Sequence, residues 1–380
     1  MLYPYNSTND CCGCKACESI CPVNAIRMEL KSDEFWYPVI DEKKCLGCNL
    51  CKKVCVENFS GFTSIDNSVS YIGKNNDNEV IKNSSSAGAF SALCIVLLNQ
   101  GYSICGVVNR DNRVYHDFAD NIEQCKAFRK SKYVQSDTSG VYEKVEGLLL
   151  NGRKVAFSGV SCQCAALYNY LELKRIPTDN LFVINILCHG VASQKIFFDY
   201  LQHERIIDYE FRYKHKQRNG KYNSKTARLT MINGKTKIAT SISDAFLRAY
   251  SLRLFYRASC GYCKFACPER FTDITIADAW GAEKINSRYD AMSGLSLILL
   301  NSNKAKMLYS DISQNMSLEK VNNDWVINSQ PLFTKSTSVH KSRSTFFEIY
   351  PRVGLKKAVY SIDKPSFYTV IKDYLKLRFK

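Results

Sequence analysis

The sequence lacks the features that place a protein in or across a membrane. Its first ten residues contain neither a charged start nor an apolar stretch, so we expect no secretory leader. The longest apolar run, residues 87–98, is interrupted by serine and is shorter than the ~20 residues that a spanning helix needs. A C-x3-C-x2-C triad is also missing, so radical chemistry on S-adenosylmethionine has no support. We therefore expect a cytoplasmic protein.

The chain also lacks the composition of a disordered protein. Hydrophobic residues make up 46% and charged residues 23% of the 380 residues, which are ordinary values for a globular protein. This length is sufficient for two or three packed units.

Cysteine, in contrast, is abundant. The chain contains 18 cysteines, of which nine lie in the first 55 residues and three lie between Cys260 and Cys267. In a reducing cytosol such numbers indicate metal or redox chemistry rather than disulfides.

The N-terminal cysteines form two runs with the spacing C-x2-C-x2-C-x3-C, which is typical of bacterial two-cluster ferredoxins. Three closely spaced thiolates cap three irons of one 4Fe–4S cube, and the fourth cysteine of each run binds the other cube. We therefore predict two clusters, with the ligand sets Cys11, Cys14, Cys17 and Cys55 for one and Cys45, Cys48, Cys51 and Cys21 for the other. Cys12 breaks this spacing and is interpreted as a spare thiol. The alternative is zinc, which paired C-x2-C units also bind.

Positive charge is concentrated in two segments of the chain. The formal net charge is +16, and residues 205–237 carry ten Lys/Arg against two Asp/Glu. Residues 335–380 carry eleven against three, so the remaining chain is neutral overall. Each segment is either a solvated face or a dock for an acidic redox partner such as ferredoxin or flavodoxin, an anionic membrane surface or a phosphorylated cofactor. We expect no nucleic acid partner.

The middle of the chain is predicted to alternate strands and helices. Residues 61–78 are rich in Ser, Asn and Gly and are interpreted as a linker or surface loop. A helix is expected from Phe90 to Leu98, and the preceding serines either cap it or form an anion site suited to a pyrophosphate. Strands are predicted over 154–158 and 181–187, each followed by a loop and a helix.

Four side chains follow these two strands. Ligands of α/β proteins bind at the carboxyl ends of strands. The candidate ligand-binding residues in these strand-end loops are therefore Cys162, Cys164, Cys188 and His189. The alternatives are small buried thiols and a structural imidazole. The other isolated thiols, those of Cys94, Cys105 and Cys125, are interpreted as core or surface thiols.

A third metal site is predicted near residue 260. Cys260, Cys263 and Cys267 precede Pro268 and resemble the Cys-Pro end of a ferredoxin run. A distant cysteine supplies the fourth ligand of a cluster, or the site binds zinc. Residues 273–281 are expected to form an exposed edge strand that ends in an acidic and aromatic turn.

In this order, these pieces resemble the coenzyme F420 hydrogenase/dehydrogenase beta-subunit family, over roughly residues 10–300. The segments that carry the resemblance are the double ferredoxin run and residues 84–91, 131–136, 157–163, 188–191 and 260–281. The resemblance implies an iron–sulfur flavoprotein with FAD at its centre, a third cluster and an organic acceptor, with a deazaflavin coenzyme such as F420 among the candidates.

The resemblance also implies a flavin site. FAD is expected between residues 84–91, residues 131–136 and the loops around Cys162 and His189. The residues expected to bind it are Ser84, Ser85, Ser86, Gly88, Ser131, Lys132, Tyr133, Gln135 and Ser136. Lys132 is expected to favour the reduced, anionic flavin, and His189 to donate a proton or to play a structural role. Cys162 is chosen as the fourth ligand of the third cluster over Cys188 or Cys164.

The predicted fold class is α+β, with a two-cluster ferredoxin-like domain followed by a mixed α/β flavin-binding domain. The predicted boundaries are 1–60 for the first domain, 61–150 and 151–300 for the two parts of the flavin domain, and 301–380 for a basic extension. The predicted function is an oxidoreductase that passes electrons from a ferredoxin-like donor through clusters to FAD and an organic acceptor. The alternatives are a non-catalytic electron-transfer subunit and a zinc-dependent interaction module.

Overall fold

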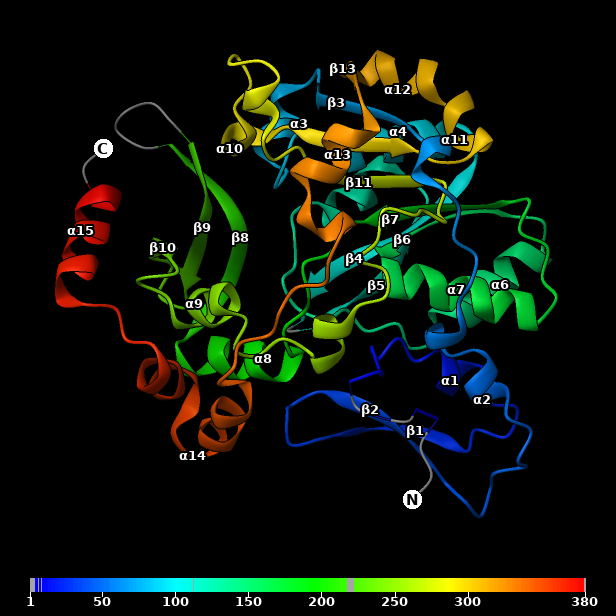
Figure 1. Ribbon diagram of the computed structural model, residues 1–380, viewed down its shortest axis with the longest axis horizontal. Coiled ribbons are helices and arrows are strands. Elements are labelled where there is room, and N and C mark those ends of the chain that lie inside the picture. Colours follow the sequence, from blue (N-terminus) through cyan, green and yellow to red (C-terminus); the bar gives the residue numbers. More distant parts are fainter. Residues whose placement is uncertain (1–3, 6, 8, 112, 217–221, 379–380) are drawn as a thin grey trace.

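The computed structural model describes residues 4, 5, 7, 9–111, 113–216 and 222–378 (Figure 1). Residues 217–221 of the first basic segment and residues 379–380 of the second lie outside the described residues. So do residues 1–3, 6 and 8 of the segment in which we expect no leader.

The N-terminal region is built from two similar halves joined by a hairpin. Strands β1 (Ile26–Leu30) and β2 (Trp36–Ile40) pair antiparallel and lie between the two cysteine runs. Short helices α1 (Ala16–Ser19) and α2 (Leu50–Lys53) begin inside the runs, and η1 (Val56–Asn58) follows. Gly13 and Gly47 occupy equivalent places with φ of 67° and 68°, which a side chain would strain. Each run therefore curls into a tight loop before its helix.

An eight-stranded sheet forms the centre of the molecule, in the order β13-β3-β12-β11-β7-β6-β4-β5. Its strands are β3 (Val69–Asn75), β4 (Tyr102–Arg110), β5 (Arg113–Ala119), β6 (Lys154–Val160), β7 (Leu181–Ile186), β11 (Ile274–Asp278), β12 (Ser296–Leu300) and β13 (Met316–Val321). Strands β4, β6, β7 and β11 are parallel, and β3 runs the same way because β12 is antiparallel to both β3 and β11. Five carboxyl ends therefore share one edge of the sheet, where open α/β sheets bind ligands.

Two expectations for this sheet are wrong. The stretch at 61–78 is not only linker, because it contains η2 (Ile65–Asn67) and β3, which lies between β13 and β12. Polar residues are tolerated there because they are paired: the Ser70 hydroxyl donates to Asn323 Oδ1 at 2.6 Å. Residues 274–278 form β11, which is an interior strand rather than an edge strand, with Ile274 and Thr275 fully buried.

Helices cover both faces of this sheet. One face packs against α4 (Ala89–Asn99), α11 (Asn303–Met307) and α12 (Tyr309–Asn315). The other packs against α6 (Val141–Leu150) and α7 (Ser161–Leu173), and this core also takes in Ala16, Val54 and Phe59 of the N-terminal region. Smaller elements join these layers: α3 (Asn78–Lys82), α5 (Ile122–Cys125), η3 (Lys126–Phe128), η5 (Ala282–Lys284), α10 (Ala291–Gly294), α13 (Asn323–Ser329) and η6 (Pro331–Phe333). The cluster-binding region is thus fused to the sheet through a shared core.

A second unit lies beside the large sheet (Figure 1). Its antiparallel strands β8 (Ile206–Lys216), β9 (Tyr222–Met231) and β10 (Thr236–Thr240) contain most of the first basic segment. Helices α8 (Gln194–His203), α9 (Ala245–Leu252) and α14 (Arg343–Ile362) share its core, with η4 (Ala258–Tyr262) after α9 and α15 (Phe367–Arg378) after α14. Helix α14 is kinked at Gly354, whose φ is 74°.

The mixed helix and strand content confirms the α+β class. In the structure β13 follows residue 300 and still pairs with β3, so the first part of the expected 301–380 extension belongs to the central sheet. No helix in the described part of the chain is long and apolar enough to span a bilayer.

Candidate functional site

The ligand set Cys11, Cys14, Cys17 and Cys55 stays a prediction, and the structure places Cys17 near thiols of both cysteine runs. Burial raises the pKa of Cys17 well above its usual value, and the nearby thiols of Cys11, Cys55 and Cys51 raise it further. Burial also raises the pKa of Cys55 to about 12, with contributions from Cys12 and Cys11. Binding of a metal group would reduce the electrostatic repulsion between these neighbouring thiols, because thiolates bound to iron share their charge with the cations.

The second group is more open. Burial raises the pKa of Cys51, and the neighbouring thiols of Cys45 and Cys48 contribute to the rise. Cys21 accepts a hydrogen bond from the Ala25 N–H at 3.2 Å, the kind of contact that steadies a ligand sulfur. Its place in this ligand set stays a prediction.

Cys12 joins the N-terminal region to a third group of cysteines. Its thiol lies close to the thiols of Cys14 and Cys162, and these two neighbours hold the Cys12 pKa well below its usual value. Sequence reasoning missed this position, because Cys12 stands outside the ferredoxin spacing and its partner lies 150 residues away in the chain.

The third group contains Cys162, Cys188, Cys260 and Cys263. The Cys162 thiol interacts electrostatically with those of Cys263 and Cys188, and the Cys260 thiol interacts with the same two. Cys267 instead neighbours Arg270 and Glu269. Cys188 therefore competes with Cys267 as a ligand of the third cluster. Within the described residues, no three His, Cys, Asp or Glu side chains form a ready-made site for a single metal ion.

Local backbone geometry brings Cys188 to this group. Gly190 has φ of 125°, and a Cβ there would lie 3.4 Å from the Cys260 Cβ and would clash with the Tyr256 ring. Only glycine permits so close an approach. Cys162 and Cys164 lie in the first turn of α7, not in a loop as the sequence suggested, because the helix begins directly at Ser161. The Cys164 thiol is turned into the core, where it donates to the Gly159 carbonyl at 3.4 Å.

Arg257 links the first cysteine group to the body of the protein. Its Nε donates to the Cys11 carbonyl at 2.7 Å, its Nη1 to Gln135 Oε1 at 2.9 Å, and its Nη2 to the Trp36 carbonyl at 3.0 Å. The guanidinium also lies 4.3 Å from the centre of the Tyr37 ring and is almost fully buried. Replacing it would leave three buried acceptors without a donor.

We expect Arg257→Met to reduce the free energy of unfolding by about 3–5 kcal/mol in urea titrations of the anaerobic protein. The reduction potential of the first cluster should also fall, because a positive charge and a donor near the Cys11 sulfur are removed. Arg153→Met is the matched control, since this exposed arginine pairs with Asp120 at 3.4 Å and should change stability by less than about 1 kcal/mol. Equal stability of the two variants would contradict this role.

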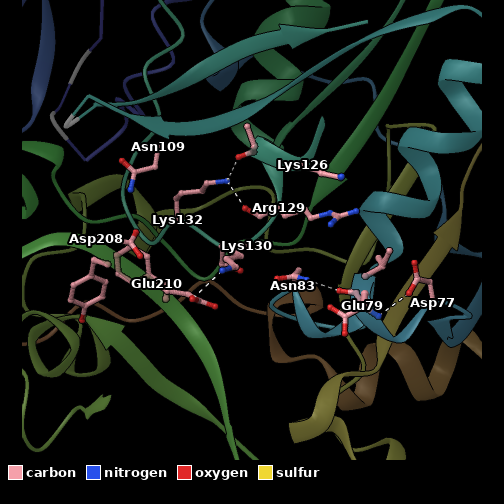
Figure 2. A pocket seen from close by; sticks show the side chains of 15 residues that line it. Asp77, Glu79, Asn83, Asn109, Lys126, Arg129, Lys130, Lys132, Asp208 and Glu210 are labelled. Carbon is pink, nitrogen blue, oxygen red and sulfur yellow. Dashed lines mark hydrogen bonds and ion pairs between the residues drawn. The ribbon is translucent and has the colours of Figure 1, made fainter. Parts of the chain in front are cut away.

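A cavity of about 630 Å³ lies at the carboxyl edge of the large sheet, within the size range of cofactor sites. Its walls come from α3, the end of β4, the segment 126–132 and strand β8 (Figure 2). Its lining contains Lys126, Arg129, Lys130 and Lys132 as well as Asp77, Glu79, Asp208 and Glu210. The Lys130 ammonium pairs with Glu210 at 3.0 Å, so part of this charge is neutralised within the wall.

The serine segment lies beside this cavity. Helix α4 begins after Gly88 with no side-chain cap, so none of the three preceding serines caps it. Instead the Ser85 hydroxyl accepts a hydrogen bond from the Ser131 N–H at 2.8 Å, and the Ser86 hydroxyl donates to the Leu295 carbonyl at 3.1 Å. The structure thus brings together the two segments that the resemblance assigns to the flavin. Arg129, in the cavity wall, donates to the Ser91 hydroxyl in the first turn of α4 at 3.1 Å.

Only two of the predicted flavin contacts in 131–136 line the cavity, namely Ser131 and Lys132. Tyr133 stacks on Tyr250 with ring centres 4.5 Å apart. The Gln135 amide donates to the carbonyls of Cys12 and Gly13 at 2.9 and 3.1 Å, and the Ser136 hydroxyl accepts from Gln163 at 2.9 Å. These three side chains support the cysteine groups rather than the cavity.

Lys132 is held within the cavity wall. Its ammonium donates to the carbonyls of Val107, Arg129 and Phe128 at 2.8, 2.9 and 3.0 Å (Figure 2 shows it pointing toward this backbone). Burial, assisted by Lys130, lowers the pKa of Lys132 to about 7. With its donors used on the backbone, it can act on a bound anion through its charge.

This arrangement predicts a pH-dependent flavin affinity. Lys132 is protonated below pH 7 and loses its charge as the pH rises, so titrations of flavin-free protein should show weaker FAD binding at pH 9 than at pH 6.5. Lys132→Ala should weaken FAD binding about tenfold at pH 6.5, an effect of ~1.4 kcal/mol, and flatten the pH dependence. Lys174→Ala, whose exposed ammonium pairs with Glu146 at 3.2 Å outside the cavity, should retain the wild-type profile. Undiminished affinity in Lys132→Ala would place the flavin elsewhere.

His189 lies near the end of β7, beside charged groups from β8 and β11. Burial lowers the pKa of His189, while Asp278 opposes this shift and Arg212 and Arg253 assist it. Arg212 forms a buried ion pair with Asp278 and lies 5.2 Å from the centre of the Trp280 ring. The Arg212 Nη2 atom is buried without a hydrogen-bond partner. Sequence reasoning missed Arg212, because its closeness to His189 and Asp278 depends on how β8 packs beside the large sheet.

Comparison with known proteins agrees with this organisation. Residues 152–324 match the family described as the C terminus of the coenzyme F420 hydrogenase/dehydrogenase beta subunit. This part of the chain is therefore similar to that family. Residues 10–59 match the 4Fe-4S dicluster domain, which supports the prediction of 4Fe–4S clusters in this region. The two matches support a resemblance to the F420 hydrogenase beta subunit over residues 152–324 and to iron–sulfur proteins with two 4Fe-4S clusters over residues 10–59.

Similar solved structures include the xenon-derivatised F420-reducing [NiFe] hydrogenase complex from Methanosarcina barkeri. The match has a TM-score of 0.45 and 15% sequence identity, and it covers 76% of this chain and 93% of that chain. No curated protein matches the chain.

Proposed function

We propose that this protein is an iron–sulfur flavoprotein oxidoreductase that takes electrons from a ferredoxin-like donor and reduces an organic acceptor at FAD. The observation that carries the proposal is the position of Cys12, whose thiol interacts with that of Cys14 on one side and with that of Cys162 on the other. Cysteine groups that are far apart in the sequence thereby form one continuous series, which leads from the ferredoxin-like region to the carboxyl edge of the sheet.

The residues fit the groups that this function requires. Cys11, Cys14, Cys17 and Cys55 would hold the first cluster, and Cys45, Cys48, Cys51 and Cys21 the second. Cys162, Cys260 and Cys263 would hold the third, with Cys188 as the fourth ligand in preference to Cys267 because its thiol lies among the other three. When bound, the clusters supply one-electron chemistry and the flavin supplies hydride chemistry.

The chain's own residues prepare the flavin site. The Ser85–Ser131 hydrogen bond holds residues 84–91 and 131–136 together at the N-terminus of α4, where the uncapped N–H groups suit a pyrophosphate. Lys132 and Arg129 add positive charge in the cavity wall. Beside this site, the Tyr133 ring stacks on that of Tyr250, whose hydroxyl donates to the Gly190 carbonyl at 3.1 Å.

His189 is suited to hold a proton at the acceptor. Burial lowers its pKa, so the imidazole is neutral at physiological pH and presents one N–H donor and one acceptor nitrogen. The neighbouring Arg212–Asp278 ion pair determines the electrostatic environment of the His189 imidazole. A deazaflavin coenzyme such as F420 is one acceptor to test, alongside quinones and other two-electron acceptors.

The deciding experiment is a cofactor analysis of anaerobically purified protein, followed by reduction. We expect one FAD per chain, bleaching of the flavin absorbance near 450 nm by reduced ferredoxin, and its recovery when a two-electron acceptor is added. Protein that binds clusters but no flavin, even after incubation with FAD, would contradict the enzyme and favour the electron-transfer subunit. Stoichiometric zinc without sulfide would support the zinc module instead.

A further inference from the structure

Helix α15 carries its apolar side chains on its outer face. Phe367, Tyr368, Ile371 and Leu375 fall within about 100° of the helix circumference at 100° per residue, and all are exposed. Phe367 and Tyr368 are 81% and 73% exposed, values that belong to side chains with almost no cover from the protein. A surface helix of a globular protein normally shows the reverse pattern, with its apolar stripe turned inward.

The opposite, polar side of α15 is the side that contacts the protein. The Asp373 carboxylate accepts a hydrogen bond from the Thr240 hydroxyl of β10 at 2.6 Å. Asp373 lies about 160° from Leu375 and about 120° from Phe367 around the helix, so this contact turns the apolar face away from the body. Figure 1 shows α15 at the edge of the molecule, beside the β8–β10 unit and far from the N-terminal region.

The positive charge around this apolar face indicates which kind of surface it binds. Residues 335–380 carry eleven Lys/Arg against three Asp/Glu, and the exposed Lys364 and Lys372 lie just before α15 and beside its apolar arc. An aromatic and aliphatic face bordered by lysine is the pattern of helices that lie in the interface of anionic bilayers, where rings sit at the headgroup level and lysines reach the phosphates. An acidic protein would match the lysines, but it would also need an apolar patch of its own to cover the aromatic face.

We propose that α15 docks the protein on an anionic lipid bilayer, with the helix lying in the plane of the membrane. This interaction goes beyond the proposed redox function and does not depend on it. Each lysine near an anionic surface strengthens binding by about fivefold, and the effect is screened by salt. Burial of Phe367 and Ile371 in the headgroup region adds an apolar contribution that salt does not weaken.

The test is co-sedimentation of the full-length protein with vesicles of phosphatidylcholine alone or with phosphatidylglycerol. We expect binding to the anionic vesicles and at least about tenfold weaker binding to the neutral ones. Phe367→Ser with Ile371→Ser should weaken binding to the anionic vesicles at least about tenfold, and Lys364→Glu with Lys372→Glu should do the same at 0.1 M salt. The matched control is Met307→Ser with Lys306→Glu on α11, where Met307 is 75% exposed, and it should bind as the wild type does.

A second measurement reports insertion directly. Tyr368→Trp should show a blue shift of the added tryptophan fluorescence with anionic vesicles, provided that iron and flavin contents match the wild type. Absence of binding to anionic vesicles, or equal binding by the Phe367→Ser, Ile371→Ser protein, would overturn the proposal. Self-association that this double variant abolishes, without any vesicle binding, would instead identify the face as a contact between protein chains.

Discussion

Anaerobically purified Cys14→Ser and Cys48→Ser proteins are each expected to lose one of the two N-terminal clusters, about four irons per chain. The two residues belong to different ligand sets, so both variants should retain the other cluster, and the double variant should lose about eight irons. Wild-type protein should contain at least about eight irons with matching acid-labile sulfide. Iron and sulfide analysis with paramagnetic resonance spectra of the reduced proteins measures these changes.

Cys105→Ala is the matched control for this experiment. Cys105 lies in β4, fully buried in the core shared with α6 and α7, and the charged groups that affect its thiol are Lys144 and Asp117 rather than other cysteines. Its iron content should equal that of the wild type. Stoichiometric zinc without sulfide in the wild-type protein would contradict the two-cluster assignment outright.

The second large effect concerns the third cysteine group. Cys263→Ser should lower the iron content from about twelve to about eight per chain and should remove one paramagnetic signal. It should also slow reduction of the flavin by reduced ferredoxin, because Cys263 interacts with Cys12, Cys162 and Cys260. Stopped-flow absorbance near 450 nm measures this rate.

The fourth ligand is decided by a pair of variants. Cys188→Ser should lose the same four irons as Cys263→Ser, while Cys267→Ser should keep them, because Arg270 and Glu269 are the groups that surround Cys267. The reverse result would restore Cys267 to the ligand set and make Cys188 a structural thiol. Full iron content with an unchanged spectrum in Cys263→Ser would exclude a third cluster at this position.

Local signals in the sequence were sufficient for several elements of the fold. Strands β6 and β7 were expected near their observed positions because each is a short apolar run followed by a turn. Strand β3 could not be recognised in the same way, because it includes Ser70, Gly73 and Asn75, which are poor strand formers. Ser70 and Asn75 are satisfied by Asn323 and by the Gly88 carbonyl, which are separated from them in the sequence. Strand β11 was misplaced at an edge because nothing local shows that β12 and β7 enclose it.

The sequence by itself determined the cluster chemistry of the N-terminal region, because ligand spacing is a local property and each ferredoxin run closes its own loop. Only the tertiary structure decided the surroundings of the other groups. It placed Cys12 against Cys162, Cys188 beside Cys260, Lys132 on backbone carbonyls and Arg212 on Asp278. Each of these contacts joins residues from different loops or strands, and their approach depends on how the sheet is ordered and how the N-terminal region packs on α7. Contacts of this kind leave no periodic pattern in the sequence, so they become visible only when the chain is folded.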